Sequence, residues 1–210
     1  MNMKRAGFLS LISLLGLSGC ASMSADECIT SDWNAIGFED GSKGYTADQI
    51  GRRRQACAKH GVTPDFEAYQ KGRKQGLRQY CKPGRGFSLG KSGARYNGVC
   101  PARLEADFIN AYNQGHHLYS LRSRVNGASA QISAKEHELD NVNDRIRSTE
   151  AQLIATETTI QDRILLLADL KELSERTGQL EAEIADLIAD RAAAEQQLSA
   201  YQAVLANSGF

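Results

Sequence analysis

The sequence contains five cysteines, and their spacing limits the thiol chemistry that they can support. Four of them lie in one stretch of the chain: Cys28, Cys57, Cys81 and Cys100. None forms a CxxC pair, the spacing typical of zinc sites and thiol redox motifs. An even number of cysteines in a short stretch indicates two disulfides, with three possible connectivities. We favour Cys28 with Cys57 and Cys81 with Cys100, because each pair brackets a local segment.

A second group of side chains could contact a ligand. Its members are Trp33, Asp40, Arg73, Arg95 and Tyr96. A guanidinium group suits carboxylates and phosphates, so anionic headgroups and peptidoglycan peptide stems are ligands of fitting chemistry. The Gly/Arg/Tyr-rich residues 84–98 are expected to form a loop that could hold a glycan or a peptide stem.

Catalytic and metal-binding patterns are not found. Glu39 with Asp40, and His116 with His117, are neighbours that diverge on a helix, so neither pair predicts a joint site. The sequence has no GxSxG, HExxH or P-loop motif. We therefore expect no catalytic residue, no metal and no cofactor.

The N-terminal residues have the order of a secretory signal. Lys4 and Arg5 precede an apolar stretch too short to span a bilayer comfortably, and small residues then lead to Cys20. The sequence Leu17-Ser18-Gly19-Cys20 resembles a lipobox. This predicts a signal peptide at residues 1–19, removed on export, and acyl chains such as palmitate on Cys20. The alternative is an ordinary signal peptide or membrane anchor with a chance cysteine.

The residues after Cys20 bear on location. Ala21 and Ser22 follow it, and the absence of Asp there favours the outer membrane, with the body facing the periplasm. Residues 20–27 are expected to be the lipidated anchor and a polar spacer. The periplasm is oxidising, which agrees with disulfides.

Charge and composition divide the exported chain into two regions. Residues 21–117 carry 14 Lys and Arg against 10 Asp and Glu, whereas residues 118–210 carry 9 against 15. We expect a small Cys/Gly-rich helical domain at 28–119, an acidic coiled coil at 120–206 and a short tail at 207–210. Neither region is basic enough to predict a nucleic-acid partner.

Glycines recur with aromatic residues in the first region. Trp33-x-x-x-Gly37-x-x-x-Gly41 is echoed by Tyr69-x-x-Gly72-x-x-x-Gly76, and more weakly by Tyr112-x-x-Gly115. Glycines four residues apart share a helix face, and each costs a helix roughly 1 kcal/mol relative to alanine. Close helix packing would offset this cost, and a ligand-facing groove is the alternative.

The order of these residues is similar to that of a bacterial lipoprotein family catalogued as a domain of unknown function (DUF2799). The similarity covers residues 28–119. It runs through the Trp33 and Tyr69 glycine motifs, through His60-Gly61, and through the glycines before Cys100-Pro101. The resemblance implies a periplasm-facing, mostly helical module. It implies no activity, cofactor or catalytic residue.

The acidic region has apolar residues at steps of 3, 4 or 7, which predict a coiled coil. Two frames meet at Leu167, Leu170 and Leu173, where the 3 and 3 spacing is typical of a stammer in a continuous rod. The chain could instead fold back near residues 174–178 as a hairpin. We favour the rod, because Ser-Glu-Arg-Thr-Gly is weak turn chemistry. The expected fold is all-α, a small disulfide-stapled helical domain followed by a long coiled-coil helix or helical hairpin.

These patterns favour a non-enzymatic outer-membrane lipoprotein that acts as an envelope structural or interaction protein through its coiled coil. The expected partners are the membrane, through the lipid anchor, and either a second copy or an envelope protein, through the coiled coil. The alternative is a peptidoglycan- or glycan-binding module that uses the 84–98 loop.

Overall fold

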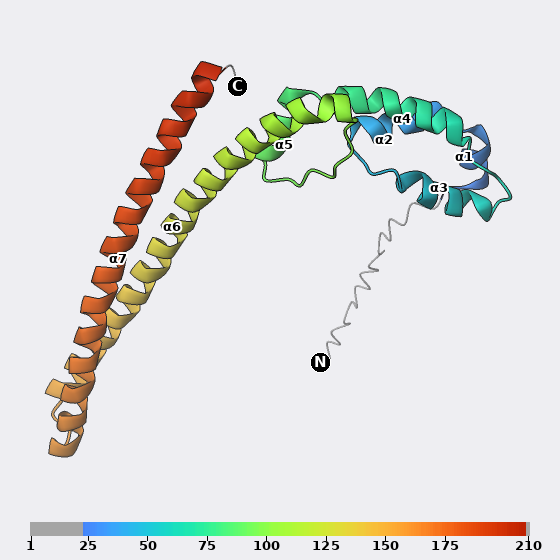
Figure 1. Ribbon diagram of the computed structural model, residues 1–210. Coiled ribbons are helices and arrows are strands. Elements are labelled where there is room, and N and C mark those ends of the chain that lie inside the picture. Colours follow the sequence, from blue (N-terminus) through green and yellow to red (C-terminus); the bar gives the residue numbers. More distant parts are fainter. Residues whose placement is uncertain (1–22, 209–210) are drawn as a thin grey trace, which may run out of the picture. The chain divides into compact units, whose positions relative to one another are not determined.

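The computed structural model describes residues 23–208, all of whose regular structure is helical (Figure 1). The helices are α1 (Ala25–Thr30), α2 (Trp33–Ser42), α3 (Gln49–Ala58), α4 (Phe66–Tyr80), α5 (Pro83–Lys91), α6 (Ala102–Ile154) and α7 (Ile160–Ser208). The all-α prediction is confirmed. The expected signal peptide and Cys20 lie outside the described residues. None of the helices described is both long and apolar enough to cross a bilayer.

The chain divides into two compact units. The first ends at Gly76 and the second begins at Leu77, so the division falls within α4 and inside the 28–119 segment expected to form one domain. The close helix contacts at glycines and the disulfides fall within the units and do not join one unit to the other. One glycine-rich helix contact and one disulfide belong to each unit.

The first unit begins with a helix where the sequence analysis expected a spacer. Ser24 and Glu27 form a capping box at the start of α1, each side chain bonding to the other residue's backbone N–H. Asp32 then caps α2, because its carboxylate accepts hydrogen bonds from the backbone N–H groups of Asn34 and Ala35. Residues 24–27 are therefore part of the capped start of α1.

Helices α3 and α4 are separated by a segment that begins with a turn at Gly61. Gly61 has a φ of 70°, a left-handed conformation that favours glycine. Helix α4 begins at Phe66. The carboxylate of Asp65 accepts a hydrogen bond from the backbone N–H of Ala68 at 2.9 Å. Asp65 thus caps the first turn of α4.

The expected loop at residues 84–98 is mostly the helix α5. Its glycines let it pack directly on the backbone of α6: a Cβ added at Gly86 would lie 2.4 Å from the carbonyl oxygen of Phe108, and one at Gly90 would lie 2.1 Å from that of Tyr112. Pro83 stands in its first turn. Packing, rather than helix propensity, therefore explains this helix.

The acidic region folds as a hairpin, not as the favoured rod (Figure 1). Helices α6 and α7 run antiparallel, and the chain turns at residues 155–159, whereas residues 174–178 lie inside α7. The hydroxyl of Thr159 accepts a hydrogen bond from the backbone N–H of Asp162 and so caps α7. The Arg163 guanidinium donates to the carbonyl oxygens of Thr158 and Ala155, each at 3.3 Å.

The two arms bury a shared apolar seam. It contains Leu121, Ile132, Val142, Leu173, Leu180, Ala194 and Leu205. Polar positions in the seam form ion pairs between the arms: Lys135 Nζ lies 2.7 Å from Glu183, and Arg176 lies 2.5 Å from Glu138. The polar residue at position 135, which interrupts the apolar pattern, is thus satisfied within one chain.

Candidate functional site

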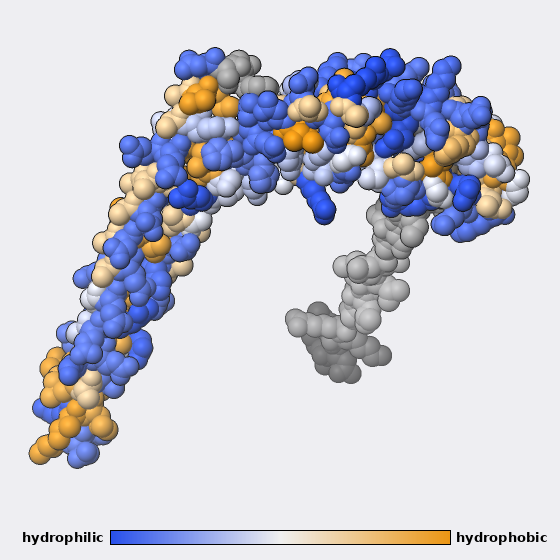
Figure 2. All heavy atoms as spheres, viewed as in Figure 1, coloured by the Kyte–Doolittle hydropathy of each residue, from blue (hydrophilic) through white to orange (hydrophobic). Residues whose placement is uncertain are grey.

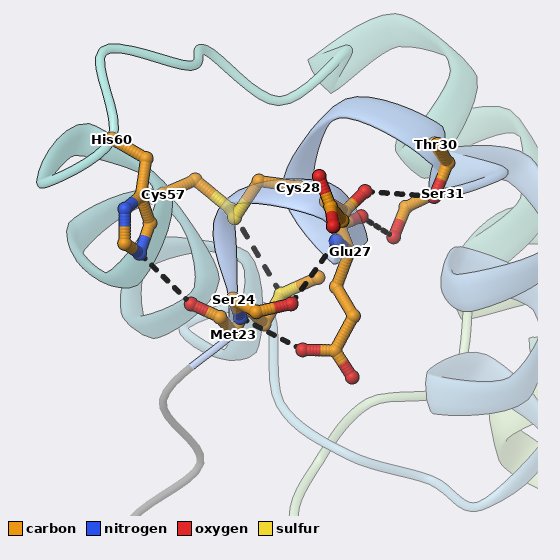
Figure 3. The surroundings of a disulfide bond; sticks show 9 residues. Met23, Ser24, Glu27, Cys28, Thr30, Ser31, Cys57 and His60 are labelled. Carbon is orange, nitrogen blue, oxygen red and sulfur yellow. Dashed lines mark hydrogen bonds between the residues drawn. A yellow bond between two sulfur atoms is a disulfide. The ribbon is translucent and has the colours of Figure 1, made fainter.

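The first disulfide joins Cys28 in α1 to Cys57 in α3, with the two Cα atoms 5.6 Å apart (Figure 3). Both cysteines are buried. Beside the disulfide, the Sδ atom of Met23 lies 3.9 Å from Sγ of Cys57, and Nε2 of His60 lies 3.2 Å from the Met23 carbonyl oxygen. The disulfide and His60 therefore hold the start of the described chain against α3.

The second disulfide joins Cys81 and Cys100, with the two Cα atoms 5.7 Å apart. It connects the end of α4 to the residue before Pro101, and it packs in a core with Tyr80 and Phe108. Both disulfides have the connectivity that we favoured from the sequence. These four cysteines are structural cross-links.

Asp40 is almost fully buried, with 1% of its surface exposed. Its carboxylate accepts hydrogen bonds from Nη2 of Arg53 at 2.8 Å and from the phenol of Tyr69 at 2.9 Å. Burial, followed by the hydrogen bond to Asp40, raises the pKa of Tyr69 well above its ordinary value. This paired carboxylate links α2, α3 and α4, so it stabilises the first unit.

Sequence reasoning singled out Asp40 but missed its two partners. Tyr69 was visible as the aromatic residue that opens the second glycine motif, and Arg53 as one of three consecutive arginines. No local pattern pairs residues 13 and 29 positions away from Asp40. The packing of α2, α3 and α4 brings Asp40 together with these two residues.

The other two candidates in the first unit also have structural contacts. Trp33 is buried and packs in a cluster with Cys28, Cys57 and Tyr69. Arg73 donates from Nη2 to the carbonyl oxygen of Tyr45 at 2.9 Å. Trp33, Asp40 and Arg73 thus belong to one unit, in which they connect its helices.

The remaining candidates, Arg95 and Tyr96, lie in the second unit. The Tyr96 phenol donates to Glu105 at 3.0 Å and accepts from the backbone N–H of Cys100 at 2.9 Å. Its ring lies 4.9 Å from that of Phe108, and burial raises its pKa. Tyr96 therefore closes the core, whereas the side chain of Arg95 is exposed.

The sequence segment around Arg95 is rich in exposed cations. Residues 77–104 contain no Asp or Glu, and all of their Lys and Arg side chains are exposed: Arg78, Lys82, Arg85, Lys91, Arg95 and Arg103. Arg85 lies over the Tyr80 ring at 6.0 Å. This segment forms a basic part of the second unit.

The two adjacent histidines point to different neighbours, as expected. The His116 ring stacks near that of Tyr112, and the His117 ring meets Tyr201 edge-on at 4.5 Å. In the part of the chain that the structure describes, no group of three or more His, Cys, Asp or Glu is placed to hold a metal ion.

The two most exposed large apolar residues among those described, Ile154 and Ile160, lie at the end of the hairpin away from α5, where Figure 2 shows hydrophobic surface. We call this surface the hairpin tip and define it as Ile154, Ile160, Ile164, Leu165 and Leu167. Ile154 and Ile160 are 80% and 82% exposed, and the other three are more than half exposed. Large apolar side chains left exposed near one end of an element are typical of interaction sites, so the hairpin tip is the main candidate site.

No curated protein and no solved structure matches the chain. One family model does match, and it covers α2 to α5 and the first part of α6 while leaving out most of the hairpin. Residues 32–117 match the family described as "Protein of unknown function (DUF2799)", which confirms the resemblance inferred from the sequence.

Proposed function

We propose that this protein is a non-enzymatic outer-membrane lipoprotein that acts as an envelope structural or interaction protein through its periplasmic hairpin. The observation that supports this function is the hairpin tip. Five large apolar side chains, each more than half exposed, belong to the end of the hairpin, whose sides are mostly hydrophilic on the face that Figure 2 shows. An isolated chain gains nothing from this exposure, whereas a partner that covers the tip gains the free energy of apolar burial.

The hairpin is suited to presenting such a surface. Its arms have 53 and 49 residues, and ion pairs between the arms fix their register near Glu138 and Glu183. The Arg163 contacts to Thr158 and Ala155 hold the turn. The tip is thus carried on an ordered scaffold, which lowers the entropy cost of binding.

The attachment to the membrane rests on Cys20 and the residues before it. Each buried methylene of an acyl chain contributes about 0.8 kcal/mol, so more than one chain on Cys20 gives stable anchoring. Localisation to the outer membrane, facing the periplasm, is part of the proposal and is supported by Ala21 and Ser22, since lipoproteins with this signal that stay in the inner membrane tend to have Asp there.

The anchor is tested with the full chain expressed in a bacterium that is fed labelled palmitate. The wild type is expected to incorporate the label, to lack its first residues and to sediment with outer membranes. Cys20→Ser is expected to lose the label. An unlabelled wild-type chain that retains residues 1–19 would overturn the lipoprotein assignment.

The interaction role is tested by photo-crosslinking in intact envelopes. A photoreactive residue at position 160, in the tip, is expected to give cross-linked products, and one at Asp140, an exposed position of α6, is expected to give few. Position 160 giving no more cross-linked product than position 140 would overturn the tip as the interaction site.

The basic segment at residues 77–104 favours a second candidate function. Its six exposed cations have no acidic residue within the segment, so they fit the carboxylates of peptidoglycan peptide stems. The full chain is then expected to be retained on purified peptidoglycan, with retention weakened by Arg95→Ala and unchanged by Arg147→Ala in the hairpin. Equal retention of the two variants would remove this candidate.

A further inference from the structure

Helix α7 has a second stripe of residues beside its buried seam. The seam positions that face α6 include Leu166, Leu170, Leu173, Thr177, Leu180, Ile184, Leu187 and Arg191, all buried or half-buried. The residue after each of them is exposed. Together with Ile160 and Ile164, these form the outer stripe: Ile160, Ile164, Leu167, Lys171, Ser174, Gly178, Glu181, Ala185, Ile188 and Ala192.

The outer stripe stays on one face of the hairpin. One residue corresponds to about 100° of rotation, so the stripe lies on the flank of α7. It repeats with the same spacing as the seam, and therefore it keeps a constant angle to α6 along the helix. A side-chain carbon added at Gly178 would meet no atom within 4 Å, so this flank is open in the middle.

The outer stripe is complementary to itself when read in the opposite direction. We consider two copies of α7 that run antiparallel about a twofold axis at the level of Arg176. The stripe residues then face one another as follows: Ile160 with Ala192, Ile164 with Ile188, Leu167 with Ala185, Lys171 with Glu181, and Ser174 with Gly178. In this register Ile160 and Leu167 of the tip each face an alanine, and Ile164 faces Ile188.

Charge and size both favour this antiparallel register. Lys171 meets Glu181 twice, once on each side of the axis, and the small residues Ser174 and Gly178 allow close approach at the centre. A parallel pairing would place Lys171 against Lys171 and Glu181 against Glu181, and like charges directly opposite destabilise a helix pair. The stripe thus has one favourable way to pair with itself.

We propose that the occupant of the outer stripe is a second copy of this chain, which forms an antiparallel four-helix arrangement of two hairpins. The pairing covers Ile160, Ile164 and Leu167 of the hairpin tip, together with Ile188. This inference rests on the proposed function for the role of the hairpin and names the partner, and it does not depend on the lipid anchor.

The register is tested with two differently tagged full chains, one carrying Leu167→Cys and the other Ala185→Cys. Mixed in detergent and oxidised, they are expected to form a disulfide-linked heterodimer. Leu165→Cys with Ala185→Cys is the matched control, because Leu165 is 57% exposed and Leu167 is 55% exposed but Leu165 lies outside the stripe. A heterodimer yield no higher than the control, with only monomer by light scattering, would overturn the proposal.

The charge contacts give a second test. Lys171→Glu and Glu181→Lys alone each place like charges at both contacts, and each is expected to weaken the dimer on the order of tenfold. An equal mixture of the two variants restores opposite charges and is expected to dimerise like the wild type. The ion pair between Lys171 and Glu175 on the same helix cannot explain that recovery, because it is absent from the Lys171→Glu chain in both cases. A mixture no tighter than either variant contradicts the register.

These outcomes separate the inference from the proposed function. If the full chain is not lipidated in the bacterium but still dimerises in detergent, the pairing is supported and the lipid anchor is refuted. A lipidated monomer whose tip cross-links to a different protein supports the proposed function and overturns the second copy as partner.

Discussion

The molecule contains two kinds of helix contact that respond to substitution in opposite ways. Where α2 crosses α4 and α5 crosses α6, glycines bring backbones together: an added Cβ would lie 1.8 Å from the Asn34 carbonyl oxygen at Gly72, and 2.1 Å from the Phe87 carbonyl oxygen at Gly115. In the hairpin, side chains such as Leu180 fill the space between α6 and α7. At the glycine contacts between helices there is no room for an added side-chain carbon. In the hairpin, removing side-chain carbons would leave a cavity between α6 and α7.

The two kinds of contact also differ in covalent support. Each unit that contains a glycine crossing has one disulfide, and the hairpin has none among its described residues. Glycine crossings bury little side-chain surface, so hydrophobic burial contributes less to them. The disulfides restrict the unfolded chain and compensate for the smaller apolar core.

The largest expected effect is the loss of volume in the hairpin seam. Leu180 is fully buried, so Leu180→Ala should lower the free energy of unfolding by about 2–5 kcal/mol. Leu165→Ala, at an exposed position of the same helix, should change it by less than about 0.5 kcal/mol. Urea unfolding followed by circular dichroism measures both. Equal effects of the two would refute the seam as the source of hairpin stability.

Removal of a disulfide should come next in size. Replacing Cys28 and Cys57 by alanine should destabilise the first unit by about 2–4 kcal/mol and leave the hairpin unaffected. Hydrogen exchange, read separately for α2 and for α7, measures the two regions in one sample. Faster exchange throughout α7 would contradict the separation into two compact units.

A single added methyl group should destabilise the glycine crossing. Gly72→Ala forces apart the backbones of α4 and α2 and should cost about 1–3 kcal/mol, despite the better helix propensity of alanine. Gly51 in α3 has no atom within 4 Å of an added Cβ, so Gly51→Ala should stabilise by about 0.5–1 kcal/mol. Thermal melts of the pair should therefore shift in opposite directions, and shifts of the same sign would contradict the close crossing.

The smallest effect should be an acid-dependent weakening of the hairpin. The Arg176 hydrogen bond holds the pKa of Glu138 below its ordinary 4.5, and the Lys135 hydrogen bond does the same for Glu183. A carboxyl group with a lowered folded pKa contributes stability above its unfolded pKa, and this is lost as pH falls through the folded value. The hairpin melting temperature should thus decrease below pH 4.5.

The control for the acid effect removes both carboxylates. A Glu138→Gln and Glu183→Gln chain should lose most of that pH dependence, and added salt should reduce it in the wild type because the pairs are partly exposed. A slope that is the same in the variant and the wild type would assign the effect to other groups.

Much of the fold followed from local patterns, and the exceptions have physical reasons. Asp32 and Gly61 are strong helix-boundary signals that act within a few residues, which agrees with the start of α2 at Trp33 and the turn after α3. Helix α5 was missed because its glycines lower helix propensity and its stability comes from packing on α6. The turn at residues 155–159 was missed because it contains neither Gly nor Pro.

The break in the apolar pattern at Leu167, Leu170 and Leu173 also has an explanation. Leu170 and Leu173 face α6, whereas Leu167 belongs to the exposed outer stripe. One helix with two stripes produces the same spacing as a stammer in a single stripe, so spacing alone cannot distinguish a rod from a hairpin. The structural roles of Asp40 and Tyr96 could not be predicted because they depend on partners that are distant in the sequence. The exposed tip could not be predicted without knowing where the hairpin turns.

Helix α6 is one unbroken helix from the crossing with α5 to the hairpin tip. Its 53 residues correspond to about 80 Å at 1.5 Å per residue. A continuous helix of this length is stiff. A sideways force on the tip is therefore transmitted along α6 as a torque on its contact with α5, near Gly90 and Gly115. Whatever holds the tip is therefore mechanically coupled to the disulfide-linked end of the same unit.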